Sequence, residues 1–137
     1  MGRYSDVLMD HFTSPRHSGA MESPDRVGQA GAPGRGPFLI LYLRMDGDRV
    51  ADSRFQTYGC GPLIASGSVL TGAIEGRAAG ECLGLTEEDI IEALDGVPPE
   101  KRHGPALAIM ALRDALRGFA PGADQAGAGD AASLRAT

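Results

Sequence analysis

The stretch from Arg54 to Ser68 constrains the fold of this chain more than any other part of it. It begins with the alternation of a β-strand, breaks at Gly59 and continues with the pattern of a helix. Pro62 falls in the first turn of that helix, where proline is well tolerated. This order places the thiol of Cys60 at a helix N-terminus, where backbone N–H groups and the helix dipole favour a thiolate. Cys60 is therefore a candidate metal ligand or nucleophile, although a lone cysteine can also be a small buried apolar residue.

The length and composition are typical of a small protein with one domain. The chain has 137 residues, a formal net charge of −5, 5% aromatic residues and no tryptophan. An acidic chain with so few aromatic side chains is a poor candidate for binding nucleic acid or an anionic membrane. No apolar run is long enough to cross a bilayer, and the N-terminus does not resemble a signal peptide. Because its two cysteines form no framework of paired spacings, we expect a cytoplasmic protein with free thiols.

The periodicity of apolar residues predicts an α+β fold with a three-stranded antiparallel sheet and three to four helices. Strands are expected near Val27, over 38–45 and over 50–58, and Asp46-Gly47-Asp48 is a hairpin signal between the last two. Ala51, Ser53 and Phe55 are expected to share one face of the last strand. The predicted helices cover residues 4–12, 62–76, 86–94 and 105–119.

The rest of the chain is expected to be loop or disordered. Residues 80–85 form a predicted connector that contains Cys82, and the pair Pro98-Pro99 predicts an extended segment with Val97. On the last helix, Met110 is expected to face the core. We predict that residues 1–120 form one domain. The Ala-, Gly- and Asp-rich residues 121–137 are expected to be a disordered tail.

Several motifs, taken together, resemble the IscU-type iron–sulfur scaffold family, also known as the NifU N-terminal domain family. The resemblance extends over roughly residues 4 to 119, and its most specific block runs from Thr57 to Ser66. The other matching residues are Tyr4-Ser5, His11, Pro15-Arg16, Val27-Gly28, Gly31-Ala32-Pro33, Arg54-Phe55, Pro98-Pro99, Lys101 and His103.

The resemblance implies a protein that is not an enzyme but a scaffold for building a [2Fe–2S] cluster. Such scaffolds receive persulfide sulfur from a cysteine desulfurase and pass the cluster to acceptor proteins, in many systems with a chaperone pair. Family members hold the cluster, or an iron or zinc ion, with cysteines from three places in the chain and with an Asp and a His nearby. Thiolates suit iron and zinc, and an exposed site with mixed ligands can release its cargo.

This chain departs from that ligand pattern at three positions, so its metal site is degenerate. Arg35 and Pro37 stand where the family has Cys and Asp, and Gly104 stands where the family has the Cys of a His-Cys pair. Only Cys60 and His103 match the ligand motifs. Two ligands are too few for a stable cluster or zinc site. The resemblance implies a structural role for Cys82, which lies outside those motifs. We expect surface or capping roles for His11 and His17.

Three functions remain open for such a chain. It could bind iron or a [2Fe–2S] cluster weakly, or across a homodimer in which two copies supply Cys60 and His103 twice. It could be a metal-free paralogue that binds partners or regulates assembly, with the Arg35 guanidinium replacing part of the metal's charge. Alternatively, Arg35 points to solvent. Cys60 and His103 could also act as a thiol–imidazole pair that accepts persulfide sulfur.

A segment before the last motif is a candidate partner-binding site. The family has Leu-Pro-Pro-Val-Lys here and binds a chaperone through it, whereas this chain has Val97, Pro98, Pro99, Glu100 and Lys101. An extended proline pair is pre-organised for docking. Glu100 introduces a negative charge in place of an apolar side chain, so recognition by the same chaperone is open. A rigid connector between two helices is the alternative.

Overall fold

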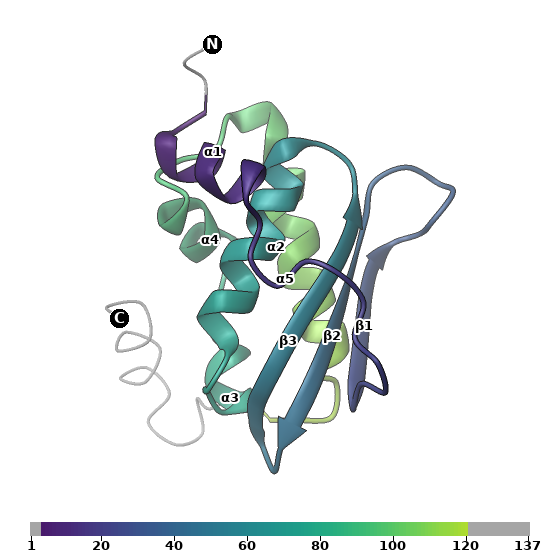
Figure 1. Ribbon diagram of the computed structural model, residues 1–137. Coiled ribbons are helices and arrows are strands. Elements are labelled where there is room, and N and C mark those ends of the chain that lie inside the picture. The colour runs from purple at the N-terminus through teal and green to yellow at the C-terminus, as the bar shows by residue number, and fades with distance from the viewer. Residues whose placement is uncertain (1–3, 121–137) are drawn as a thin grey trace.

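Three antiparallel strands form one sheet in the order β1-β2-β3 (Figure 1). They are β1 (Arg26–Gly31), β2 (Phe38–Asp46) and β3 (Arg49–Tyr58) in a computed structural model that describes residues 4–120. A two-residue turn with Gly47 at φ +63° joins β2 to β3, as the Asp-Gly signal predicts. The predicted α+β class and antiparallel sheet are confirmed. The predicted disordered tail, residues 121–137, lies outside the described residues.

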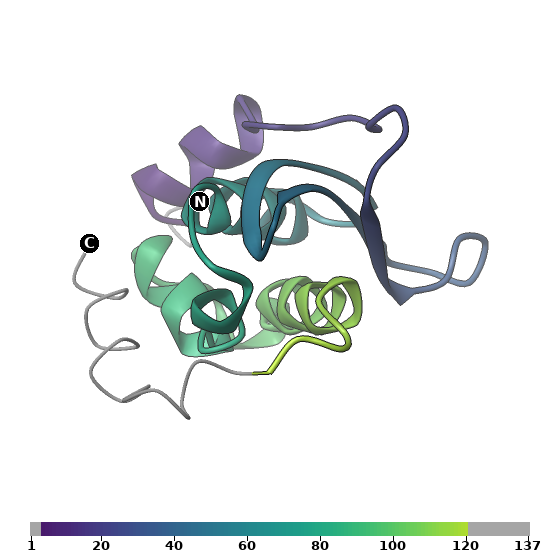
Figure 2. The same cartoon turned by 90° about the horizontal axis from the view of Figure 1, so that it is seen from below.

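One face of the sheet carries the core. Leu39, Leu41 and Leu43 alternate along β2 and are fully buried. The helices α2 (Gly61–Ile74) and α5 (His103–Ala115) pack on that face (Figure 2). The approach is close, because a Cβ atom at Gly28 of β1 would lie 2.1 Å from a backbone oxygen of α5. A glycine is therefore needed at this contact.

The inner face of β3 differs from its prediction at one position. Ser53 and Phe55 are buried as expected, but Ala51 is exposed and Val50 takes the inner position instead. The register between β2 and β3 shifts at Arg44/Met45, and such an irregularity inverts the alternation beyond it.

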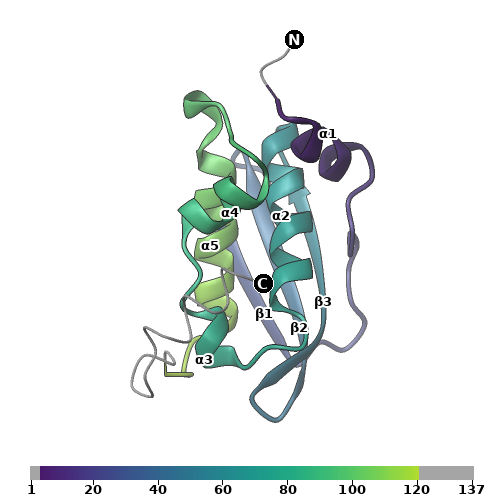
Figure 3. The ribbon, with the colours of Figure 1, turned by 90° about the vertical axis from the view of Figure 1, so that its left-hand side faces the viewer.

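Three short helices complete the helical layer, together with one 3-10 turn (Figure 3). They are α1 (Asp6–Thr13), α3 (Ala79–Cys82), α4 (Glu87–Ala93) and η1 (Pro99–Lys101). The described residues thus form five α-helices rather than three to four, because α3 lies within the predicted connector. None of the helices in residues 4–120 is both long and apolar enough to cross a membrane.

Two local predictions for the C-terminal part were wrong. Pro99 begins a 3-10 turn and is not extended, because only a residue that precedes a proline is restricted to extended backbone, and Pro99 precedes Glu100. Met110 is 54% exposed, whereas Ile109 and Leu112 are buried on the inner face of α5.

Candidate functional site

A strand-to-helix turn presents Cys60. β3 ends at Tyr58, Gly59 has φ +152°, and Cys60 is the N-cap residue of α2. A Cβ atom at position 59 would lie 2.7 Å from the Leu63 side chain, so the turn requires glycine. The Cys60 side chain makes no capping hydrogen bond. The thiol is thus held at the helix N-terminus, as the sequence predicts, and is half-buried.

The fold brings Cys60 to His103, the first residue of α5. The Sγ of Cys60 lies 3.4 Å from the Nε2 of His103, and the imidazole is exposed. Two adjacent ligands on one tetrahedral ion, at metal distances of about 2.3 Å for sulfur and about 2.0 Å for nitrogen, are separated by about 3.5 Å. The observed distance therefore suits either a hydrogen bond between thiol and imidazole or shared binding of one metal ion.

The neighbouring ligand position is closed by packing. A Cβ atom at Gly104 would lie 3.0 Å from the backbone nitrogen and Cα of Leu63 and from the carbonyl carbon of Pro62. The N-terminus of α5 therefore lies directly against the first turn of α2. Any side chain at position 104 would have to move one of these backbones. Position 104, where the family has a cysteine, thus lies in a close contact between the two helices.

The loop between β1 and β2 brings Pro37 to the cysteine turn. The Pro37 Cβ lies 3.4 Å from the position that a Cβ atom would take at Gly59. Arg35 lies two residues earlier and is exposed, and its backbone N–H donates to the Ala32 carbonyl at 3.0 Å. Within residues 4–120, the Arg35 guanidinium forms no hydrogen bond or ion pair.

The second cysteine is remote from this site and chemically protected. Cys82 is fully buried in the core, and its thiol donates to the Ile74 carbonyl at 3.8 Å. Burial raises the pKa of Cys82 to about 12, and the nearby Glu81 carboxylate contributes to the increase. These features agree with the structural role predicted for Cys82.

The two other histidines have partners away from Cys60. The Nδ1 of His11 lies 2.7 Å from the Ser68 Oγ, and burial lowers the pKa of His11. The Nδ1 of His17 lies 3.6 Å from the Oε2 of Glu75. Both imidazoles are half-buried at the surface and also have tertiary contacts, which the expected surface or capping roles did not include. No local pattern indicates these contacts, because Ser68 and Glu75 lie more than 50 residues further along the chain.

Within residues 4–120, no further metal ligands gather around Cys60 and His103. In the part of the chain that the structure describes, no group of three or more His, Cys, Asp and Glu side chains is arranged to hold a metal ion. The degenerate ligand set read from the sequence is thus not compensated by donors from other elements in that range.

The candidate partner-binding segment leads directly into α5. Val97 is buried, Pro98 is half-buried, and Pro99 and Glu100 are exposed at the start of η1. Lys101 is half-buried and ends η1, two residues before His103. The exposed part of this segment therefore lies close in sequence to the candidate site, although it is a 3-10 turn and not an extended strand.

An aromatic pair beside the thiol was not predicted. Tyr58 is 66% exposed and stacks on Phe38, with 6.3 Å between the ring centroids. The register pairs Phe38 directly with Tyr58. The apolar pattern of both strands contained this signal, but only the register shows that the rings meet on the outer face of the sheet.

Comparisons with known proteins agree on one family. Residues 3–124 match the family model described as the NifU-like N terminal domain. The chain is 40% identical over 113 residues to the iron–sulfur cluster assembly scaffold protein IscU 1 of Archaeoglobus fulgidus, covering 82% of this chain and 74% of that protein. It is 34% identical over 120 residues to the scaffold protein IscU of Escherichia coli, covering 85% of this chain and 93% of that protein.

Solved structures show the same fold at lower sequence identity. A candidate SUF-system scaffold from Fervidobacterium islandicum aligns with a TM-score of 0.71 and 24% identity over 83% of this chain and 96% of that chain. The N-terminal part of a NifU-like protein from Brucella abortus aligns with a TM-score of 0.54 and 19% identity over 96% and 95% of the two chains. The chain therefore belongs to the NifU N-terminal domain family of IscU-type iron–sulfur cluster assembly scaffolds, which are not enzymes.

Proposed function

We propose that this protein is an iron–sulfur assembly scaffold with half a ligand set, which holds a [2Fe–2S] cluster between two copies of the chain. The observation that supports this function is the 3.4 Å separation of Cys60 Sγ and His103 Nε2. That separation is close to the spacing of two neighbouring ligands on one tetrahedral ion. Each copy then supplies one thiolate and one imidazole, and two copies supply the four ligands that a cluster normally takes.

The exposure of the pair suits a shared site. His103 is exposed and Cys60 is half-buried, so a second copy can approach both ligands. Gly104 adds no side chain between the two helices. A cluster held by only two ligands per copy, in an open site, binds weakly and is released readily. Release is what a scaffold needs when it passes its cargo to an acceptor protein.

This proposed role requires partner proteins that supply sulfur and take up the cluster. A cysteine desulfurase would deliver persulfide sulfur to Cys60, and acceptor proteins would take the finished cluster. The segment from Val97 to Lys101 is the proposed chaperone or partner contact, because its exposed residues lead directly to His103. The negative charge of Glu100 favours a partner with a basic side chain at that point. Location in the cytoplasm stays a prediction.

A second candidate is a metal-free protein that accepts persulfide sulfur and binds partners. The close contact at Gly104 supports it, because a ligand at this position would require a backbone shift. The Cys60–His103 contact supports it as well, since an imidazole beside a thiol can take its proton. In this role the chain would carry sulfur on Cys60, or regulate assembly through its partners, without building a cluster.

Anaerobic reconstitution with ferrous iron and sulfide separates the two functions. The shared scaffold predicts a chromophore that absorbs visible light at about one cluster per two chains. The Cys60→Ser variant should lose it, and the His103→Gln variant should weaken it. The Cys82→Ala variant is the matched control and should retain it. Absence of a chromophore, combined with a mass increase at Cys60 after incubation with desulfurase and cysteine, would support the sulfur acceptor instead.

A further inference from the structure

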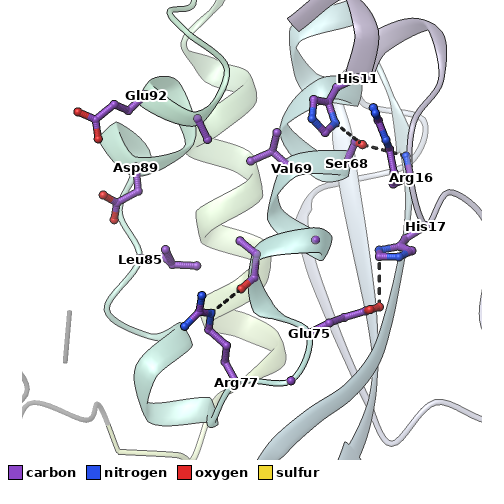
Figure 4. A pocket seen from close by; sticks show the side chains of 14 residues that line it. His11, Arg16, His17, Ser68, Val69, Glu75, Arg77, Leu85, Asp89 and Glu92 are labelled. Carbon is purple, nitrogen blue, oxygen red and sulfur yellow. Dashed lines mark hydrogen bonds and ion pairs between the residues drawn. The ribbon is translucent and has the colours of Figure 1, made fainter. Parts of the chain in front are cut away.

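A groove runs along the second half of α2, away from Cys60. It has a volume of about 770 Å³ and lies between the C-terminal half of α2 and α4, with the end of α1 and the segment after it on the other side (Figure 4). The residues of α2 and its C-terminal end that line the groove extend from Ser68 to Arg77. At 1.5 Å per residue the helical part of this run, from Ser68 to Ile74, is about 9 Å long, or about three residues of extended chain.

The groove has an apolar floor. It is lined by Val69 and Ala73 of α2 and by Leu85, which lies between α3 and α4. Gly72 lies on the same part of α2, is exposed, and has nothing within 4 Å of the position that a Cβ atom would take. No packing contact therefore requires a glycine there. The absence of a side chain at position 72 leaves the floor of the groove open to an apolar side chain from elsewhere.

One rim of the groove is acidic. Asp89 and Glu92 lie on α4, across the groove from His11, Arg16 and His17 (Figure 4). Within residues 4–120, no basic side chain forms an ion pair with the Glu92 carboxylate. On the opposite side, Arg16 already pairs with Asp10 at 2.7 Å. A ligand that places an apolar group on the floor and a basic group at the α4 rim would complement the groove.

Residues 121–137, which follow the described residues, contain one such segment. In residues 121–137, Leu134 is the single large apolar residue and Arg135 is the single basic residue, and they are adjacent. We propose that the Leu134–Arg135 pair occupies the groove, with the Leu134 side chain on the apolar floor and the Arg135 guanidinium at the Glu92 rim. This inference is independent of the cargo at Cys60.

The groove is within reach of that segment. The described chain ends after α5 beside α3 (Figures 1 and 3), and α3 follows Arg77 at one end of the groove. Thirteen residues separate Ala120 from Leu134, and a chain of that length can span at most about 45 Å. A tethered segment acts at a high effective concentration, which favours weak contacts within one chain over the same contacts between separate molecules.

The test uses the full chain and the amide signals of the groove in ¹H–¹⁵N spectra. Leu134→Asp should shift the signals of Val69, Ala73 and Leu85. Ala132→Asp is the matched control, because it adds the same charge two residues away and should leave them unchanged. Gly72→Leu should fill the groove and make these signals insensitive to Leu134→Asp. Equal spectra for the Leu134→Asp and Ala132→Asp variants would overturn the proposal.

A charge exchange tests the rim separately. Glu92→Arg and Arg135→Glu should each reproduce part of the Leu134→Asp shifts, and the double variant should restore the original signals. The expected loss is about two- to fivefold in the ratio of docked to free tail, as for an exposed ion pair. Glu87→Arg is the control, since Glu87 lies on α4 but does not line the groove. If the signals instead shift with protein concentration, a second copy occupies the groove and the proposal is wrong.

Discussion

Gly104 at the start of α5 lies against Leu63 of α2, so that a Cβ atom at position 104 would be 3.0 Å from the Leu63 backbone nitrogen. The two helices that carry His103 and Cys60 therefore meet through a glycine. This contact lies beside the His103 imidazole and the Cys60 thiol, whose Nε2 and Sγ are 3.4 Å apart. It also fills the space that a ligand at position 104 would need. Glycine at position 104 thus accompanies a close approach of the two helices that carry the remaining ligands.

The Gly104→Ala variant should lower the free energy of unfolding by about 1–3 kcal/mol, because the added methyl group overpacks a backbone contact. Urea unfolding measures the change. Gly72→Ala is the matched control, since it also adds a methyl group to a helix but points into open space. It should raise the free energy of unfolding by about 0.5–1 kcal/mol. A neutral Gly104→Ala variant would contradict the close approach of α5 to α2.

Only one of the two thiols should react in the folded protein. At about pH 8, iodoacetamide should modify Cys60, which is half-buried at an open turn. Cys82 should not react, because burial raises its pKa to about 12. Mass spectrometry should find one adduct per native chain and two after denaturation in urea. Modification of Cys82 at the rate of Cys60 under native conditions would show that the core around α3 opens readily.

The Arg35→Gln variant distinguishes the two roles considered for Arg35. The side chain is exposed and has no ion-pair partner in residues 4–120. A solvent-screened charge has little effect on a neighbouring group, so the alkylation rate of Cys60 should change by less than about twofold. The His103→Gln variant removes the imidazole beside the thiol and should change the rate more. A larger effect from Arg35→Gln would place the guanidinium next to the thiolate.

His11 should make the folded state less stable in mildly acidic solution. Burial lowers the pKa of His11, and the positive charge of Arg16 lowers it further. The unfolded chain, with an ordinary histidine pKa of about 6.5, therefore binds a proton here more readily than the folded chain. The associated stability is fully present above about pH 6.5 and is lost as the pH falls through the folded pKa.

The control for that pH dependence is the His11→Gln variant, which keeps a polar group near Ser68 and does not titrate. Urea unfolding at several pH values between about 7.5 and 5 should give a steeper decrease for the unaltered protein than for the variant. Parallel curves would contradict this prediction, because protonation of His11 would then leave the free energy of unfolding unchanged.

The sequence predicts the sheet and the cysteine turn well, because both depend on local patterns. Alternation defines the strands, and Gly59 and Pro62 mark a strand-to-helix turn regardless of tertiary context. The register shift at Arg44/Met45 leaves no local signal, so the exposure of Ala51 was not foreseen. The four-residue α3 is too short to show a helical period.

The candidate site was predictable only in part, because it depends on contacts that leave no local pattern in the sequence. The resemblance of the motifs to one family pairs Cys60 with His103, which lie 43 residues apart. No pattern in the sequence indicates that Gly104 touches Leu63. The groove along α2 is equally hidden, because its walls come from α1, α2 and α4. Contacts between distant elements depend on side-chain volumes and not on periodicity.

Replacing Arg35 with Cys and Pro37 with Asp should give a single copy four ligands, while position 104 still lacks the family's third cysteine. Both positions are exposed, so the changes should leave the fold intact, and Cys60 and His103 then gain a second thiolate and a carboxylate. Reconstitution with iron and sulfide should give about one cluster per chain instead of about one per two chains, since four ligands come from a single copy. The cluster should also resist a chelator for longer.

Arg35→Ser combined with Pro37→Asp is the control and should keep the original ratio of about one cluster per two chains, because serine supplies no thiolate. An unchanged ratio in the Cys variant would show that the loop before β2 does not bring position 35 to the thiol of Cys60.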